Sequence, residues 1–243
     1  MKKIKCVRIK FANSIEFNEI PAFRAAIAKL HPQKSVLLHH HLNDEQLLYR
    51  YPVLQYKIYN EHPYIMALEE GTDLALKLAE HKEKTISIYK KQVDLEIESL
   101  NLFHHTVQVW DKTFSYKIYN WLALNGENYQ KFQRTTALKD RVKMLEDILT
   151  AHILAFTEGI HYMPEKEIFA TIHKIHAQRW IMYKKISRAA FELTFETNIS
   201  LPEFIGLGKS PSVGFGMIKK TKKIENIFAN PDTLESQKIP VFN

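Results

Sequence analysis

Cysteine occurs only once among the 243 residues, at Cys6. A single thiol cannot build a disulfide framework or a zinc site made of several cysteines, and it is consistent with a reducing compartment. No stretch approaches the roughly 18 apolar residues that a membrane-spanning helix needs. The basic start, residues 1–3, is followed by charges at Lys5 and Arg8 instead of the apolar core of a signal peptide. We therefore expect a cytoplasmic protein that does not enter a membrane.

An excess of acidic residues is also missing. Lys and Arg number 34 against 27 Asp and Glu, which gives a net charge of +7 and a pI of about 9.2. A basic balance suits a polyanionic partner but does not distinguish RNA from DNA. With 45% hydrophobic and 25% charged residues, the chain has an ordinary globular composition, and its length allows one large domain or two small ones.

Glycine is scarce as well, and four of the seven glycines lie within residues 206–216, here called the glycine-rich loop. Two Gly-apolar-Gly units flank five residues that include Lys209. Without a Cβ, such a backbone can turn tightly and bring its N–H groups close to a phosphate-bearing ligand. A nucleotide-binding P-loop is excluded, because Glu203 stands where that motif needs glycine and Pro211 opposes the helix that must follow. A flexible hairpin connection is the alternative interpretation.

Periodicity predicts an α+β fold. Alternating apolar residues predict an opening strand over residues 4–11, and helical spacing predicts a helix that begins after Asn18 as its N-cap. Further strands are expected over residues 47–59, 92–100 and 113–119, within 167–197, and from Phe215 to Lys219. Helices are expected over residues 72–82 and along an apolar stripe from Leu138 to Phe156, which ends at Gly159.

The glycine-rich loop, in this position, resembles the C-terminal signature of the RAMP superfamily of CRISPR-associated proteins. The chain more closely resembles those members that cut CRISPR precursor RNA within its repeats. The resemblance also rests on Leu38-His39-His40-His41, on the run from Tyr49 to Lys57, and on Trp121-Leu122-Ala123-Leu124-Asn125 followed by Asn128-Tyr129. It implies two tandem ferredoxin-like (RRM-like) βαββαβ domains. These are an N-terminal domain over residues 1–90 with the histidines, a C-terminal domain over 91–222 with the glycine-rich loop, and a flexible tail over 223–243.

The histidine cluster is the first candidate for chemistry. In an extended segment His39 and His41 project to the same side, about 7 Å apart along the chain. The ordinary histidine pKa of about 6.5 lets such a side chain take or give a proton near neutral pH. A surface loop and a metal site are the alternatives, although three adjacent histidines cannot easily all face one metal.

The resemblance implies a cleavage that needs no metal and no cofactor. The 2′-hydroxyl of the RNA attacks the adjacent phosphorus and leaves 2′,3′-cyclic phosphate and 5′-hydroxyl ends. His39 and His41 then carry the two proton transfers in an order that stays open, and His40 is kept as a substitute for either. Lys57 is expected to stabilise the charge that develops on the phosphorane, and an ordinary exposed strand lysine is the alternative.

The expected RNA contacts combine the backbone of the glycine-rich loop, polar groups beside Lys57, and basic residues among aromatic ones. They are Gly206, Gly208, Lys209, Ser210, Gly214 and Gly216 in the loop, Tyr51 and Gln55 beside Lys57, and Lys174, His176, Arg179, Lys184 and Lys185. Basic residues interleaved with Trp180 and Tyr183 suit phosphate attraction and base stacking. The alternative is a solvated strand face with both aromatic side chains in the core.

The resemblance further implies CRISPR repeat RNA, or precursor crRNA, as the partner of a monomer or homodimer. The alternative function, from another class, is a non-catalytic RNA-binding subunit of a CRISPR effector complex, whose other subunits would then be partners. Such a subunit shares the glycine signature but has no need of the histidine cluster.

Overall fold

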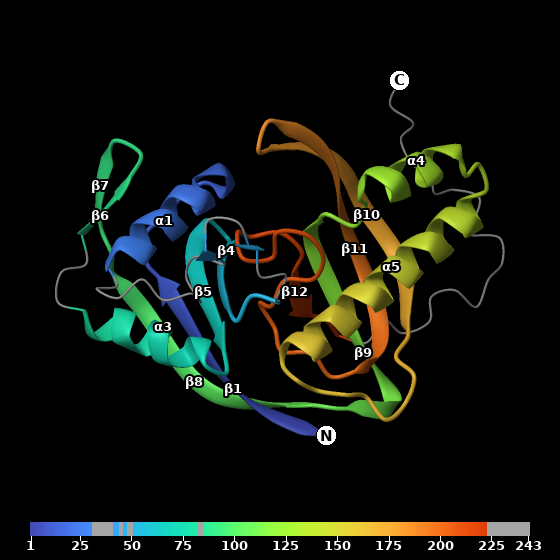
Figure 1. Ribbon diagram of the computed structural model, residues 1–243, viewed down its shortest axis with the longest axis horizontal. Coiled ribbons are helices and arrows are strands. Elements are labelled where there is room, and N and C mark those ends of the chain that lie inside the picture. The colour runs from blue at the N-terminus through green and yellow to red at the C-terminus, as the bar shows by residue number, and fades with distance from the viewer. Residues whose placement is uncertain (31–40, 44–45, 48–50, 82–84, 223–243) are drawn as a thin grey trace.

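The computed structural model describes residues 1–30, 41–43, 46–47, 51–81 and 85–222. It has two four-stranded sheets, each covered by helices on one face (Figure 1). The two units lie side by side, and the chain passes between them from strand β8 (Ile97–Val107) to strand β9 (Val109–Trp121).

The first sheet has the strand order β4-β5-β1-β8, with antiparallel neighbours throughout. Its other strands are β1 (Lys2–Phe11), β4 (Leu54–Tyr59) and β5 (His62–Leu68). Helices α1 (Ile20–Leu30) and α3 (Gly71–Glu80) follow its first and third strands in chain order and cover one face. There Val7 and Ile9 of β1 pack in one buried cluster with Phe23 and Ile27 of α1. This connectivity is that of a ferredoxin-like unit.

The start of α1 differs from the prediction. Asn18 is not the N-cap, because it lies inside a short 3-10 turn, η1 (Phe17–Glu19). Glu16 caps that turn together with Glu19, whose carboxylate accepts a hydrogen bond from the Glu16 backbone N–H at 2.8 Å. The local hydrogen bonds of two glutamates therefore begin this helical segment, and helix α1 follows from Ile20.

The predicted domain boundary at residue 90 is wrong. Strands β6 (Thr85–Ile88) and β7 (Lys91–Asp94) form a separate hairpin after α3. The following strand, β8, pairs with β1 from Val107 opposite Lys2 to Ile97 opposite Phe11. Because β8 completes the first sheet, the first domain extends to about Val107, and the segment 92–100 does not belong to the second domain.

The second sheet has the strand order β10-β11-β9-β12. Its other elements are α4 (Gly126–Arg134), α5 (Leu138–Gly159), β10 (Ala170–Tyr183), β11 (Ile186–Ile199) and β12 (Met217–Lys220). Alternate residues of β11, Phe191 to Phe195, are buried with Leu149 and Phe156 of α5, so the predicted amphipathic helix is confirmed, including its end at Gly159. No helix in the described part of the chain is long and apolar enough to span a membrane.

The second domain has the ferredoxin-like strand order but departs from the predicted βαββαβ pattern in one element. Residues 200–216, all of them described, connect β11 to β12 through turns in place of the second helix. The tandem ferredoxin-like architecture is thus confirmed, and the missing helix is replaced by the segment that carries the glycine-rich loop.

Candidate nucleic-acid interface

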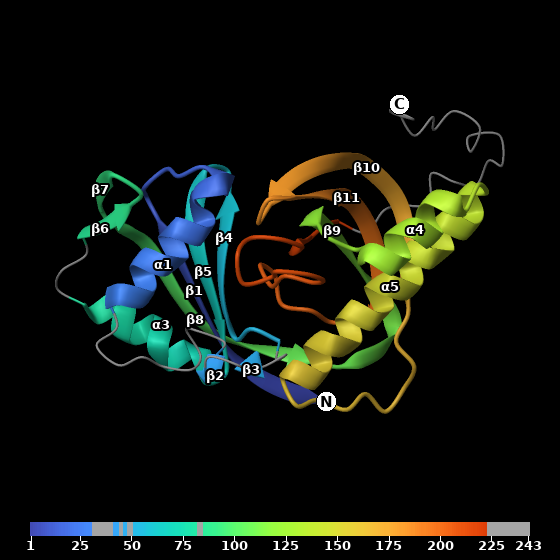
Figure 2. The ribbon, with the colours of Figure 1, turned by 45° about the horizontal axis from the view of Figure 1, so that its top comes forward.

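The glycine-rich loop lies at the junction of the two domains, where Figure 2 shows it between the two sheets. The backbone N–H of Gly206 donates a hydrogen bond to Gln55 Oε1 at 2.8 Å, and its carbonyl accepts one from the Tyr51 hydroxyl at 2.9 Å. The backbone N–H of Tyr56 donates to the Ser212 carbonyl at 3.0 Å. The loop therefore extends the edge of β4 and ties the second domain to the first.

The loop needs glycine for contacts within the protein. A Cβ on Gly208 (φ +90°) would lie 2.7 Å from the indole nitrogen of Trp121, and one on Gly216 (φ +63°) would lie 1.8 Å from the Leu207 carbonyl oxygen. Gly206, Gly214 and Gly216 are buried, which corrects the expectation that they face a ligand. In the accessible part of the loop, residues 208–211, Gly208, Lys209 and Ser210 remain predicted RNA contacts.

Lys57 is fully buried, with 0% of its surface exposed. Its ammonium donates hydrogen bonds to the carbonyls of Pro211 at 2.6 Å and Phe215 at 3.5 Å, on the glycine-rich loop. Burial lowers the pKa of Lys57 well below its usual value. Lys57 was expected either to stabilise charge on the phosphorane or to be an ordinary exposed strand lysine. Both expectations required an accessible side chain, so both are wrong. Gln55 was expected to contact RNA, and it is also fully buried. In this arrangement Lys57 holds the loop against β4.

The buried Lys57 predicts a specific pH dependence of stability. The unfolded chain keeps the lysine proton up to a pKa of 10.5, whereas the folded chain releases it at lower pH. Between the two values the unfolded state binds more protons, so the free energy of unfolding rises with pH by up to about 1.4 kcal/mol per pH unit.

We expect the native chain to gain stability relative to Lys57→Met as the pH is raised toward 10.5. Urea unfolding over this range checks the expectation, with Lys29→Met, an exposed lysine of α1, as the control. A difference between native and Lys57→Met that stays constant with pH would contradict it.

His39 and His40 lie outside the described residues. His41 begins strand β2 (His41–Asn43), which pairs with β3 (Gln46–Leu47), and the side chains of this hairpin are also outside the description. Ten residues after His41, the ring of Tyr51 contacts the ring of Phe156 near the end of α5 at a centroid distance of 5.2 Å. Tyr51, at the start of the next described segment, therefore lies at the domain junction. Among the side chains that are described, no three of His, Cys, Asp or Glu gather where they could share a metal ion.

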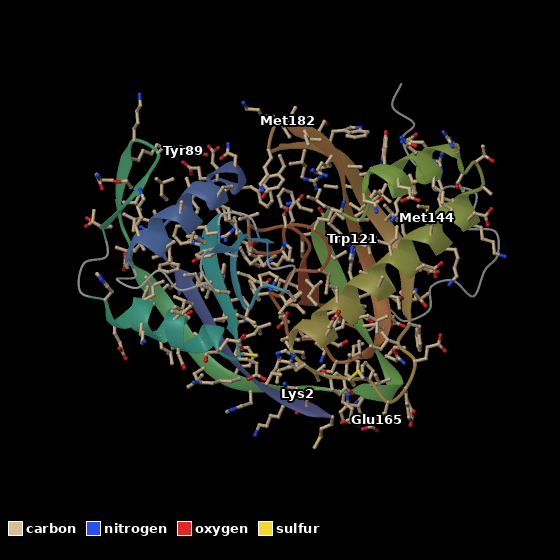
Figure 3. The ribbon with its side chains drawn as sticks, in the orientation of Figure 1. Lys2, Tyr89, Trp121, Met144, Glu165 and Met182 are labelled. Atoms are coloured by element: carbon tan, nitrogen blue, oxygen red, sulfur yellow. The ribbon has the colours of Figure 1, made fainter. Side chains whose placement is uncertain are left out.

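A small basic cluster lies beside the accessible part of the loop. His152 of α5 accepts a hydrogen bond at Nδ1 from the Trp121 indole N–H at 3.2 Å, so its neutral ring carries the proton on Nε2. Burial and then the charge of Lys209 lower the pKa of His152 to about 4. The pKa of Lys209 is itself lowered, by burial and by the charge of Arg188. Lys209 and Arg188 are thus two interacting cations beside a neutral imidazole at this point. Figure 3 shows Trp121 in the middle of the molecule.

The predicted contacts on β10 and in its turn to β11 are all exposed and lie on one hairpin. They are Lys174, His176, Arg179, Lys184 and Lys185. Two already have partners within the sheet, since His176 Nε2 lies 2.6 Å from Thr194 Oγ1 and Arg179 donates to Glu192 at 2.7 Å. Lys184 and Lys185 form the turn itself, with φ of +50° and +62°. Figure 3 shows Met182 near the tip, which projects away from the sheet.

The junction also holds a second group of cations and aromatic rings, which sequence reasoning did not bring together. Its members come from strands β1, β4, β9 and β12 and from the connecting segment 200–216. The Arg8 guanidinium lies over the Phe204 ring at 4.9 Å, and the Lys219 ammonium lies over the Tyr59 ring at 4.0 Å. Tyr59 in turn contacts the rings of Phe204 at 5.9 Å and Tyr119 at 6.0 Å. Phe204 is buried and supports the group from below, whereas Arg8, Lys219 and the rings of Tyr59 and Tyr119 are partly exposed. Cations beside partly exposed rings suit single-stranded nucleic acid, because they pair with phosphates and stack on bases.

A pocket of about 460 Å³ adjoins this group and is lined from both domains. Its lining includes Arg8, His105, Ser200, Glu203 and Lys220. His105 Nε2 lies 3.1 Å from Ser200 Oγ, and burial lowers the pKa of His105. The volume lies within the range of small-molecule sites, and two cations against one carboxylate suit a phosphate-bearing group.

No local motif could have revealed these residues. Arg8, Tyr59 and Lys219 are far apart in sequence and come together only because the two sheets face each other across the junction. Their alternation within their own strands predicts which face they occupy but not what lies opposite that face.

The fold and the junction together define a class. Two ferredoxin-like sheets, tied by a buried glycine-rich loop and presenting cations and aromatic rings between them, make a tandem ferredoxin-like protein with a surface suited to a polyanion. Residues 2–106 match the family model of the Cas6b N-terminal domain, and residues 108–221 match that of the Cas6b C-terminal domain. The chain belongs to the Cas6b family, and its resemblance to CRISPR-associated endoribonucleases is confirmed.

Similar proteins agree with this assignment. A crystal structure of Cas6b superposes with a TM-score of 0.82 at 22% identity, over 90% of this chain and 100% of that chain. A crystal structure described as the CRISPR RNA processing endoribonuclease Cas6b superposes with a TM-score of 0.71 at 20% identity, over the same shares. The uncharacterized protein MJ0978 of Methanocaldococcus jannaschii is 26% identical over 103 residues, which are 42% of this chain and 69% of that protein.

Proposed function

We propose that this chain is a metal-independent endoribonuclease that cleaves CRISPR precursor RNA within its repeats to give mature guide RNAs. The observation that carries the proposal is the match of both halves of the chain to the two Cas6b domain models. The relative described as a CRISPR RNA processing endoribonuclease has the same fold over 90% of this chain. The cations and rings at the domain junction supply a suitable surface for the RNA strand.

Three chemical tasks follow from attack by the 2′-hydroxyl. One group removes the 2′-OH proton, another protonates the leaving 5′-oxygen, and a cation stabilises charge on the phosphorane. We assign the proton transfers to His39 and His41, with His40 as a substitute for either. Because Lys57 is buried, the third task passes to accessible cations at the junction, among which Lys209 lies on the glycine-rich loop.

Cleavage of a repeat RNA in excess EDTA tests the proposal. The matched substrate carries a single 2′-deoxy nucleotide at the cut position, which is mapped first with the unmodified RNA. We expect the unmodified RNA to be cut and the 2′-deoxy RNA to stay intact, since it lacks the nucleophile. Mass spectrometry of the upstream fragment should show a 2′,3′-cyclic phosphate. Binding without cleavage of either RNA, with magnesium restored, would instead indicate a non-catalytic RNA-binding subunit.

A further inference from the structure

The pocket of about 460 Å³ at the domain junction has no task in the proposed cleavage chemistry. One wall comes from strands β1 and β8 of the first sheet, and the other comes from β9, residues 200–203 and β12. None of its lining residues belongs to the glycine-rich loop or to the histidine segment, residues 39–41. Its chemistry therefore has to be worked out from its own side chains.

Three charged side chains line the pocket, and within the described part of the chain none of them has an ion-pair partner. They are Arg8, Glu203 and Lys220. The Arg8 guanidinium lies over the Phe204 ring at 4.9 Å, and the Lys220 ammonium lies over the Phe114 ring at 5.5 Å. Glu203 Oε1 accepts a hydrogen bond from the Lys220 backbone N–H at 3.1 Å. These contacts position the three groups but leave N–H donors of both cations and acceptor sites of the carboxylate available to a ligand.

The rest of the pocket offers an apolar wall. The Tyr116 hydroxyl donates to the Leu201 carbonyl at 3.1 Å and accepts from the Leu201 N–H at 2.8 Å, so its polar atom is already engaged within the protein. Leu201 and the partly buried Phe103 also line the pocket. His105 adds no charge at neutral pH, because burial lowers its pKa. An apolar wall beside a few polar groups is the usual composition of a site for a small ligand.

We propose that this pocket binds a single guanine nucleotide, with its phosphate at Arg8 and Lys220, its base against the apolar wall, and the edge of the base at Glu203. A carboxylate only accepts hydrogen bonds, so it selects a base edge that donates them. Guanine presents its N1–H and its 2-amino group side by side. Adenine and cytosine place an acceptor next to the amino group, and uracil has one N–H between two carbonyls.

A free nucleotide and a guanosine within an RNA strand share this chemistry. For the RNA strand, the inference rests on the proposed function and adds to it a residue that reads the sequence, Glu203. The two sources are separated by the probe used.

Fluorescence anisotropy of the full chain with two labelled RNAs tests the base preference. One RNA is oligouridine, and the other is the same strand with one central guanosine. We expect the guanosine to tighten binding by about fivefold or more, the lower end for a good pair of hydrogen bonds to a base. Glu203→Gln should remove this difference without weakening binding of oligouridine, because glutamine still offers an oxygen to the Lys220 N–H. Glu165→Gln, at an exposed glutamate outside the pocket, is the control and should keep the difference.

A second variant and a second probe test the phosphate end of the pocket. Lys220→Met should weaken binding of both RNAs by a similar factor and lower the salt dependence by about one phosphate contact, whereas Lys29→Met on α1 should not. Calorimetry with GMP and UMP separates the two sources. GMP binding that exceeds UMP binding and that Glu203→Gln abolishes assigns the pocket a free nucleotide. A guanosine preference in RNA without GMP binding assigns it a nucleotide held in a strand. Circular dichroism establishes that the variants are folded.

Two results would overturn the inference. One is the absence of any preference for guanine, in the RNA pair and between GMP and UMP alike. The other is a preference that Glu203→Gln leaves intact, which would place its origin outside the pocket. Because these readouts measure binding, a chain that fails to cleave RNA in EDTA refutes the proposed function and leaves them standing. The two failures are therefore distinguishable.

Discussion

Replacing His39 and His41 together by alanine is expected to abolish RNA cleavage and to leave RNA binding intact. If each histidine carries one proton transfer, each contributes about 10²–10⁴-fold to the rate, so the double variant should lose at least the effect of one. Binding should persist if, as we propose, it depends on cations and rings at the junction, because the substitutions leave those residues unchanged. Single-turnover cleavage measures the first effect. Fluorescence anisotropy at fixed salt concentration measures the second, since phosphate contacts make affinity salt-dependent.

His40→Ala is the matched control for this prediction, because it removes an imidazole from the same segment. It should keep most of the cleavage rate if His39 and His41 act as assigned. If the double variant cleaves at the native rate, the assignment of both proton transfers is refuted. If only His40→Ala is inactive, His40 takes over one of the two roles.

Replacing Gly216 by alanine is expected to destabilise the whole protein by at least about 3 kcal/mol, the range of changes that force backbone strain or a clash in the interior. The new Cβ would lie 1.8 Å from the carbonyl oxygen of Leu207, at a φ of +63°. The backbone would have to move, although Gly216 is buried at the start of β12 and its carbonyl accepts a hydrogen bond from Leu207 N–H at 2.9 Å. The glycine-rich loop ties the two domains together, so the junction should loosen with it. Urea unfolding measures the loss.

Gly126→Ala is the matched control, because it makes the same chemical change but should not lower the free energy of unfolding. Gly126 is the first residue of α4, directly after the N-cap Asn125, and no atom lies within 4 Å of a Cβ built on it. Alanine there should be neutral or should stabilise the protein by up to about 1 kcal/mol, through helix propensity and a less flexible unfolded chain. A Gly216→Ala variant as stable as Gly126→Ala would mean that the loop can relax away from Leu207.

Local patterns predicted most of the elements correctly. The strands predicted from alternation in β1 and β11 and the helix predicted from the apolar stripe of α5 are confirmed. In each, apolar residues recur several times at the spacing of a strand or of a helix, so the local signal is strong. The N-cap at Asn18 failed because Glu16 and Glu19 supply a competing capping arrangement two residues earlier. The boundary at residue 90 failed because strand pairing is long-range, and nothing within 97–107 identifies β1 as its neighbour.

Among the candidate functional side chains, some were placed correctly from local patterns and others were not. The exposed basic residues of the β10–β11 hairpin were predicted from their spacing, and the hairpin brings them together. The resemblance implied that Lys57 faces a phosphate, on a strand face that also carries Tyr51 and Gln55. The structure places that face against the glycine-rich loop, so the three side chains hydrogen-bond to the loop itself.

By itself, the sequence determined the α+β class, the strands and helices with strong periodicity, the basic charge, and the family, through the glycine-rich loop and the histidine segment. Only the tertiary structure decided which polar residues are accessible. Alternation tells which side of a strand a residue occupies, but the free energy of burying that side depends on what packs against it. The two sheets meet at the glycine-rich loop, and this arrangement has two consequences. It buries Lys57, which hydrogen-bonds to the loop, and it brings together one surface from Arg8, Tyr59 and Lys219.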